Sequence, residues 1–429
     1  MIDILSESKA VLEYAVEIRR HLHRYPEPTS REFNTVRYII AKLEALGIPY
    51  ENVPDGGVLG YIEGAGQDRT VLLRADCDAL TMQESPDNAR GPKVCVSEND
   101  GVAHMCGHDA HVAMLLGAAK ILNEHKDLLT GRVILLFERG EEGGNCIYYV
   151  MKHIQKNQIA IDGCWANHVS VDYPVGKVGI SGGRDNAGNV NFQVLLTGHG
   201  GHASRPDLSN NPVDCFVAIY NCLKDIRMRN ISPDIPLTYS VGILEGGHKR
   251  NVIPHTLRFG GTCRFYDAPS GKAFKEQLKE VIDSNCRIYR CIPEYEVFTG
   301  PSLPLVSNET CAEIGRKALM EALGADAVVV SEPSMGSESF ATLAAYYPSV
   351  MARIGVRNEE KGITEGGHNP GFDLDEEGMI YGIAAHAAYA IAFLKDGRTI
   401  PFTPYEGTAD DLLAYMARPV PDRFDPQEA

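Results

Sequence analysis

The chain has 429 residues, which is long for one ordinary domain and predicts two. Its 41 basic and 57 acidic residues give a net charge of −16, which argues against nucleic acid or an anionic membrane as a partner. The N-terminal stretch has no basic region followed by an apolar core, and no apolar run approaches the roughly 20 residues of a membrane span. The 11 cysteines include no C-x-x-C pair, so we expect reduced thiols and a cytoplasmic protein.

Predicted helices and strands alternate over the first 170 residues. The runs 71–75 and 132–137 are continuously apolar, as expected for strands that are buried on both faces. Such alternation predicts an α/β domain with a largely parallel sheet. The spacing of apolar residues predicts helices at 5–24, 34–46, 109–125 and 145–156, and strands at 58–62, 71–75, 132–137 and 160–168.

The pattern changes near Gly182, where strands with half-buried alternation begin. The following order, strand, helix, two strands, helix and strand, predicts a ferredoxin-like module. Alternation of helix and strand resumes at Leu303, and the last thirty residues are predicted to be a loosely docked tail. We therefore predict an α/β domain of residues 1–183 and 300–429, interrupted by an α+β domain of residues 184–299. The module's predicted elements are 189–197, 212–229, 237–245, 255–265, 270–285 and 293–298.

Acidic and histidine side chains follow the buried strands, at the edge where active residues of α/β sheets gather. Asp76 and Asp78 come directly after the strand 71–75, where they can orient a ligand or cap the next turn. A denser cluster follows in His104-Met-Cys106-Gly-His108-Asp109-Ala-His111. Imidazole and thiolate are good ligands for Zn, Ni, Co or Mn ions, and Asp109 at a helix N-terminus can orient a histidine.

Adjacent carboxylates also follow the strand 132–137, as Glu141 and Glu142. Such a pair repels unless a cation lies nearby, which predicts one metal ligand and one proton acceptor. With His168 and His368 the donors number five, more than one tetrahedral ion uses, so we expect two ions that share a ligand. The predicted ligands are Cys106, His108, Glu142, His168 and His368.

The inserted module adds polar residues in glycine-rich turns. His202, Asn251 and Arg264 are suited to bind an oxyanion or a carboxylate. Taken singly, each is equally well explained as a polar residue of a surface turn.

These motifs together resemble the amidohydrolase branch of the co-catalytic metallopeptidases, which includes aminoacylases, hippurate hydrolases, auxin-conjugate hydrolases and N-acetyl-cysteine deacetylases. The resemblance extends from about residue 18 to residue 395. The segments that carry it are Arg19–Glu27, Leu73–Leu80, Met105–His111, Glu141–Gly143, the His168 motif, the turn at His202 and Asn251–Pro254.

The resemblance implies roles for these residues. Glu141 resembles the general base of that branch, and His202 resembles a lid histidine that holds the transition state, often in the partner subunit. Asn251 resembles a lid residue near the substrate carboxylate. The resemblance also implies two divalent ions, a homodimer formed through the inserted lid domain, and cleavage of small N-acyl amino acids. Cys106, His108, Glu142, His168 and His368 resemble the five metal ligands.

The sequence departs from the family pattern at three places, although no ligand is lost. Glu138-Arg139-Gly140 replaces Gln-Pro-Ala, Glu338-Ser339-Phe340 replaces Glu-Asp-Phe, and Thr81 replaces a proline. A charged Arg139 close to the metal centre is expected to reshape the pocket. Two other interpretations remain open: a dipeptidase or carboxypeptidase on the same scaffold, and a catalytically silent metal-binding homologue.

Overall fold

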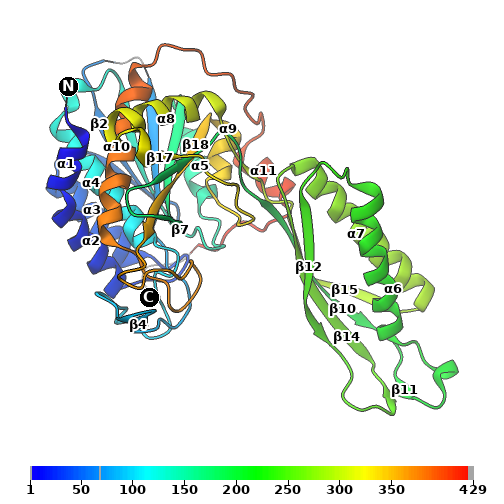
Figure 1. The fold of residues 1–429 in the computed structure, drawn as a ribbon. Helices are drawn as coiled ribbons and strands as arrows, with labels where there is room; N and C mark the ends of the chain where they lie inside the picture. Colours follow the sequence, from blue (N-terminus) through cyan, green and yellow to red (C-terminus); the bar gives the residue numbers. More distant parts are fainter. Residues whose placement is uncertain (1, 67–68, 424–429) are drawn as a thin grey trace.

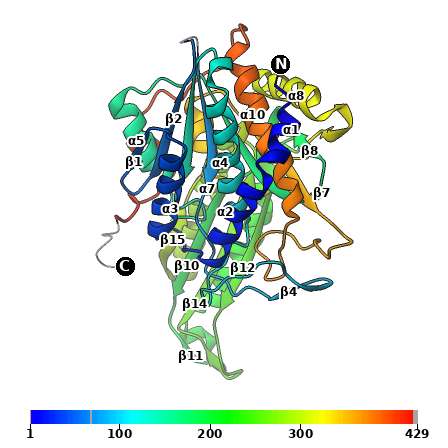
Figure 2. The same ribbon diagram turned by 90° about the vertical axis from the view of Figure 1, so that its left-hand side faces the viewer.

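The computed structural model describes residues 2–66 and 69–423, which form two lobes of unequal size (Figure 1). The larger lobe contains both ends of the described chain, and the smaller lobe projects from it as an elongated arm (Figures 1 and 2). The chain passes between the lobes through β9 (Gly183–Asn186) and β16 (Leu305–Ser307), which pair antiparallel.

A mixed eight-stranded sheet forms the centre of the larger lobe, in the order β1-β2-β6-β3-β7-β18-β8-β17. Its four middle strands, β6, β3, β7 and β18, are parallel, whereas β2 and β8 flank them antiparallel. The prediction of a largely parallel sheet therefore applies to the middle strands. The strands are β1 (Tyr50–Val53), β2 (Gly57–Glu63), β3 (Thr70–Asp76), β6 (Arg132–Glu138), β7 (Gly163–Pro174), β8 (Val178–Ile180), β17 (Val328–Val329) and β18 (Ser349–Arg357). A separate hairpin joins β4 (Asp87–Asn88) to β5 (Gly91–Pro92).

Helices cover both faces of this sheet, because side chains alternate along each buried strand. In β3, Val71 and Leu73 join one apolar core and Leu72 joins the other. The first core is covered by α1 (Ile4–Ala10), α2 (Leu12–Arg24), α3 (Phe33–Ala45), α4 (His108–Glu124), α8 (Glu309–Leu323) and α10 (Met379–Lys395), and the second by α5 (Ile147–Asn157), α9 (Ala341–Tyr346) and α11 (Ala409–Tyr415).

One segment of the described residues, Glu376–Lys395, is long and apolar enough to cross a membrane. The sequence prediction that no run approaches this length was therefore wrong. The segment comprises α10 and the turn before it, and 72% of its most apolar window is buried inside the protein. An all-round apolar helix is also what the centre of a large core requires, and α10 packs against α4 and α8 there.

The smaller lobe is a four-stranded antiparallel sheet in the order β12-β14-β10-β15, which is the ferredoxin-like arrangement. Alternate residues of β10 face the two helices and form a separate apolar core with them. A two-stranded antiparallel sheet of β11 (Gly201–His202) and β13 (Val252–Ile253) lies at the far end of the arm (Figure 1). The other elements are β10 (Gly188–Thr197), α6 (Pro212–Asp225), β12 (Leu237–Glu245), β14 (Thr256–Phe265), α7 (Ala268–Tyr289) and β15 (Ile292–Thr299).

Two sequence predictions need correction. The helix predicted over 5–24 is two helices, because Val11 has φ −96° and ψ 1° and interrupts the helical geometry. The C-terminal residues are not a loose tail throughout: α11 buries apolar side chains at helical spacing in the second core. These side chains are Ala409, Leu412, Leu413 and Met416.

Candidate metal centre

The predicted metal ligands meet at the carboxyl edge of the parallel strands. β3 ends at Asp76 and β6 ends at Glu138, just before the Glu141–Glu142 pair. β7 carries His168, and the loop that opens α4 carries Cys106. Parallel strands place their carboxyl ends at one edge, so segments far apart in sequence converge there.

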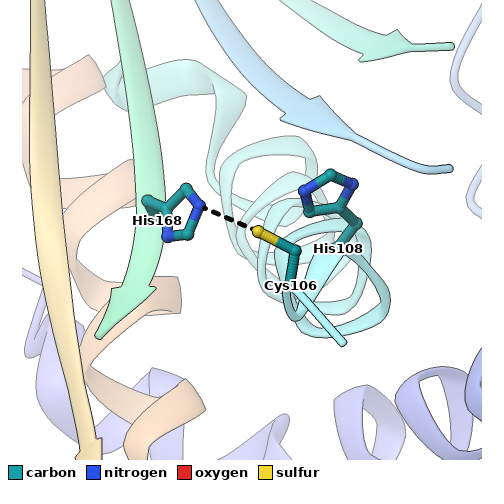
Figure 3. A group of neighbouring side chains, drawn as sticks. All are labelled: Cys106, His108 and His168. Atoms are coloured by element: carbon teal, nitrogen blue, oxygen red, sulfur yellow. Dashed lines mark hydrogen bonds between the residues drawn. The ribbon is translucent and has the colours of Figure 1, made fainter. Parts of the chain in front are cut away.

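The five donor side chains form two overlapping groups that share Cys106. Within each group the donor atoms lie within 4.8 Å of one another. Cys106 Sγ lies 3.6 Å from His168 Nε2, and His368 Nε2 lies 3.0 Å from Glu142 Oε1. Figure 3 shows Cys106 between the rings of His108 and His168. A shared donor between two groups is the arrangement that two neighbouring ions require. The groups are Cys106 with His108 and His168, and Cys106 with Glu142 and His368.

Hydrogen bonds fix which ring nitrogen of each histidine faces the cluster. His108 Nδ1 donates to Asp78 Oδ1 at 3.1 Å, and His168 Nδ1 donates to the Val169 carbonyl at 2.7 Å. The lone pair of Nε2 is then free for an ion in both rings. Asp78 also accepts from the Glu142 backbone N–H at 2.9 Å, so one carboxylate positions two predicted ligands.

His111 has a different role from His108, although both lie on α4. Its Nδ1 donates to Asp76 Oδ1 at 2.5 Å, and its Nε2 accepts the Val169 N–H at 2.9 Å. Both nitrogens are used, so His111 holds Asp76 and β7 in place and has no lone pair left for an ion. Asp109 faces away from the cluster, with its carboxylate 2.8 Å from Arg19 Nε and 2.9 Å from His23 Nδ1.

Two buried donor atoms of the cluster show that these residues fit divalent cations. His108 Nε2 is buried without a hydrogen-bond partner among the described residues, and Glu142 Oε1 lies 3.8 Å from it and 3.0 Å from His368 Nε2. A buried polar atom without a partner costs free energy, which a bound cation would recover. A thiolate, imidazoles and a carboxylate form a donor set for Zn, Mn, Ni or Co ions.

Glu141 lies beside the metal ligands and is held by the opposite wall of the cavity. Its Oε1 accepts the Ser339 backbone N–H at 2.9 Å. Burial and the nearby Glu338 carboxylate raise the pKa of Glu141 well above its ordinary value. A carboxylate with a raised pKa, held at one oxygen, is suited to accept a proton at the other.

Two of the departures from the family pattern contact each other. Ser339 Oγ donates to Glu138 Oε1 at 2.5 Å, and Arg74 donates to Glu138 at 2.7 Å and to Ser339 at 2.8 Å. Arg74 is almost fully buried and also pairs with Asp76 and Glu338. Arg74 therefore links the end of β3 to the Glu338–Ser339 segment, whose backbone N–H binds Glu141. A charged residue inside the apolar run VLLRA was the sequence signal for this role.

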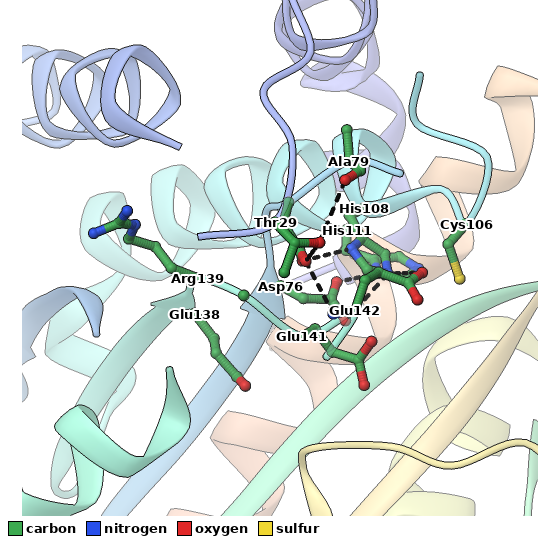
Figure 4. Close-up of polar contacts among 12 residues, drawn as sticks. Thr29, Asp76, Ala79, Cys106, His108, His111, Glu138, Arg139, Glu141 and Glu142 are labelled. Carbon is green, nitrogen blue, oxygen red and sulfur yellow. Dashed lines mark hydrogen bonds and ion pairs between the residues drawn. The ribbon is translucent and has the colours of Figure 1, made fainter. Parts of the chain in front are cut away.

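Arg139 does not approach the metal ligands, contrary to the sequence prediction. Its Nε donates to Glu32 Oε2 at 2.8 Å, and its Nη2 donates to the Ser30 carbonyl at 2.9 Å. Figure 4 shows its side chain directed away from Glu141 and Glu142. Successive residues of a chain leaving a strand point to opposite sides, which separates Arg139 from Glu138.

A cavity of about 630 Å³ opens beside the metal ligands, between the two lobes. Arg264 of β14 lines it, with Nη1 donating to Ser337 Oγ at 2.6 Å. Arg353 and Arg418 also line the cavity, and the sequence analysis did not single out either one. Arg353 lies beside His168 in the sheet, and Arg418 follows α11.

His202 and Asn251 lie outside this cavity in the same chain. Both are exposed at the far end of the arm, His202 in β11 and Asn251 directly before β13. His202 Nδ1 lies 2.7 Å from Ser204 Oγ, and the Asn251 carbonyl accepts the Ala203 N–H. One chain therefore brings together the predicted metal ligands, Glu141 and Arg264, but not His202 and Asn251.

Comparison with known proteins agrees with this geometry. The family model described as peptidase family M20/M25/M40 matches residues 72–392. The chain belongs to this family. Among M20 relatives, the IAA-amino acid hydrolase ILR1-like 2 of Arabidopsis thaliana is 35% identical, covering 91% of this chain and 88% of the relative. N-acetyl-L-cysteine deacetylase of Bacillus subtilis is 32% identical, covering 85% and 84%.

Solved structures of the M20 family have the same fold. A dinuclear metal-binding M20 peptidase from Bacillus subtilis superposes with a TM-score of 0.75 at 26% identity, covering 90% of this chain and 99% of that one. A protein described as an aminohydrolase from methicillin-resistant Staphylococcus aureus gives 0.81 at 26% identity, covering 92% and 99%. The family match and the donor set identify this chain as a metal-dependent hydrolase of amide bonds with two divalent ions.

Proposed function

We propose that the protein hydrolyses the amide bond of N-acyl amino acids, with Glu141 as general base and Cys106, His108, Glu142, His168 and His368 as metal ligands. The observation that carries this proposal is the placement of Glu141. Its carboxylate lines the same cavity as Cys106, Glu142, His168 and His368, lies within 4.8 Å of His108, and has one oxygen held by the Ser339 N–H. The names of the auxin-conjugate hydrolase and the deacetylase support the substrate class.

The reaction follows from the positions of these side chains. When bound, the two ions supply an activated water at neutral pH and polarise the amide carbonyl. Glu141 accepts the proton of the attacking water and then donates it to the leaving nitrogen. Asp78 and the Val169 carbonyl keep His108 and His168 oriented. Arg264 faces the same cavity and is placed to bind the α-carboxylate of the amino acid.

The finer features of the proposal concern the assembly. His202 and Asn251 are exposed at the end of the lid, so we propose that they complete the cavity of a partner chain in a homodimer. We propose that the two chains meet through an apolar surface formed by the free edge of β12 and the outer face of α6. Its exposed side chains are Val217, Tyr220, Ile243 and Leu244.

The charge of −16 supports a cytoplasmic protein without nucleic-acid or membrane partners. Zinc, manganese, nickel and cobalt all suit the donor set.

A dipeptidase or carboxypeptidase is the second candidate. Thermostable carboxypeptidase 1 of Saccharolobus solfataricus is 32% identical over 90% of this chain, and a peptide offers the same bond to Glu141. A catalytically silent homologue is disfavoured, because the five donors and Glu141 are all present in one cluster.

Amine release from N-acetyl amino acids, N-benzoyl amino acids and dipeptides tests the proposal, with metal-loaded wild type beside Glu141→Gln. We expect cleavage of the acylated amino acids and a loss of about 10³-fold in kcat for the variant, with both metals retained. Cleavage of dipeptides alone would assign the second candidate. Near-normal turnover of the variant would remove Glu141 as the base.

A further inference from the structure

Two guanidinium groups face the metal cavity without a carboxylate partner. Among the described residues, no carboxylate oxygen lies within 4.0 Å of Arg264 or of Arg418. Arg264 donates to Ser337 Oγ and Arg418 Nη1 donates to Asn145 Oδ1 at 3.4 Å, so their hydrogen-bond partners are neutral, and the charge that Arg418 faces is the Glu141 carboxylate, beyond ion-pair distance. Burial lowers the pKa of both guanidinium groups.

The third arginine of the cavity differs from these two. Arg353 Nη2 lies 2.6 Å from Asp185 Oδ1, so its charge is already balanced within the protein. Glu338, which lines the same cavity, is likewise paired with Arg74 at 3.0 Å. Among the described residues that line the cavity, Arg264 and Arg418 are therefore the two arginines without an ion pair, one from each lobe.

The fold holds Arg418 at this position and does not leave it on a free tail. α11 begins with a capping box, in which Thr408 and Asp411 exchange side-chain and backbone hydrogen bonds. After the helix, Ala417 adopts φ 47°, and the Arg418 N–H donates to the Leu413 carbonyl at 3.2 Å. A residue with positive φ directly after the last turn is a common way for a helix to end. Here it turns Arg418 back across the end of α11.

The position of Arg418 is close to the reacting groups. Asn145, its partner, lies three residues after Glu142 on the same loop, and Glu141 lines the same cavity. The segment that provides Arg418 lies beyond residues 72–392, the part matched by the family model.

We propose that Arg418 is a specificity-determining residue that binds a second anionic group of the substrate, so that the preferred substrate is a dianionic N-acyl amino acid. The inference rests on the proposed function. One carboxylate of the substrate binds Arg264 and the other binds Arg418, because an unpaired, half-buried guanidinium gains most from a charged acceptor. The second carboxylate belongs either to the amino-acid side chain or to a dicarboxylic acyl group.

Matched substrate pairs distinguish these two sources. N-acetyl-glutamate against N-acetyl-glutamine varies the amino acid, and N-succinyl-leucine against N-butanoyl-leucine varies the acyl group. We expect kcat/KM to be about 10- to 100-fold higher for the dianionic member of one pair, mainly through KM. Arg418→Gln should abolish that ratio, Arg418→Lys should keep part of it, and Arg423→Gln should leave it unchanged. Arg423 is the matched control, an exposed arginine five residues further along.

Binding without turnover separates this inference from the proposed function. Calorimetry of the metal-loaded protein with glutarate and with butyrate should show tighter binding of glutarate, and Arg418→Gln should remove the difference. If no substrate is cleaved but glutarate binding depends on Arg418, the proposed function fails and the anion site stands. Equal kcat/KM within both pairs, or equal glutarate binding by wild type and a folded Arg418→Gln, would overturn the inference.

Discussion

The carboxyl edge of the large sheet and the far end of the smaller lobe, which is the predicted lid, differ in how many contacts their predicted site residues make within one chain. At the sheet edge, residues between Asp76 and His368 meet within hydrogen-bonding distances and hold one another in place. At the tip, His202 and Asn251 are exposed, and their hydrogen bonds stay within the segments of β11 and β13. One chain therefore brings the five predicted metal ligands together, whereas the two predicted lid residues need a partner chain or a lid movement to reach such a cluster.

Replacing His202 tests this comparison most strongly. If it stabilises the transition state in a partner's cavity, His202→Ala should lose about 10²-fold or more in kcat with little change in metal content. Mixed dimers of His202→Ala and Glu141→Gln would then contain one intact composite site. Steady-state assays after subunit exchange should recover about a quarter of wild-type activity at random mixing.

The control for this test is each variant exchanged with itself, which should stay inactive. Full activity of His202→Ala would show that the lid tip has no part in catalysis. Inactive mixed dimers would place His202 in its own chain's site after a lid movement.

Asp76 tests whether residues that do not touch an ion support the metal centre. Asp76→Asn removes the acceptor that Arg74 and His111 share, so we expect metal affinity to fall about 10- to 100-fold. Competition with a chelator, read by metal analysis, measures this change. Asp172→Asn, at the exposed end of β7, is the matched control. Unchanged affinity in Asp76→Asn would mean that the cluster is held by its ligands alone.

Arg139 should have the smallest effect on activity, because its side chain faces away from the metal ligands. We expect Arg139→Gln to keep kcat/KM within about two-fold but to lower the free energy of unfolding by about 3 kcal/mol, since Glu32 loses its buried partner. Chemical denaturation beside the activity assay measures both. A large loss of activity at unchanged stability would restore the prediction that Arg139 shapes the pocket.

Glu32 gives the same region a pH dependence. Burial, with the nearby Asp78 carboxylate, raises its pKa to about 7 from the ordinary 4.5. The folded state then binds the proton more tightly than the unfolded state, so this contribution to stability is present below pH 4.5 and is lost as the pH rises through 7. Unfolding measured from pH 4.5 to 8 should show the decline, and Glu32→Gln should flatten it. A Glu32→Gln curve parallel to wild type would exclude this group.

The sequence by itself determined the layered α/β lobe and the ferredoxin-like insertion, and it predicted the donors that the structure brings together. Apolar periodicity reports burial directly, so the strands 71–75 and 132–137 could be located without tertiary information. Histidine, cysteine and carboxylate residues also lie close together in the sequence at strand ends, and this spacing predicts a metal site without tertiary information. The resemblance then supplied the roles of Glu141 and His202, which stay predictions until they are tested.

Only the tertiary structure decided the direction of side chains and the contacts between distant segments. Arg139 turns towards Glu32 and not towards the predicted ligands, although it lies only two residues before Glu141 in the sequence. Glu138 and Ser339 meet through Arg74, and α11 brings Arg418 to the cavity from the C-terminal segment. No local pattern encodes such contacts, because they depend on how layers pack after the chain has folded, and a charged residue in a loop is compatible with either a solvent-exposed or a cavity-facing position.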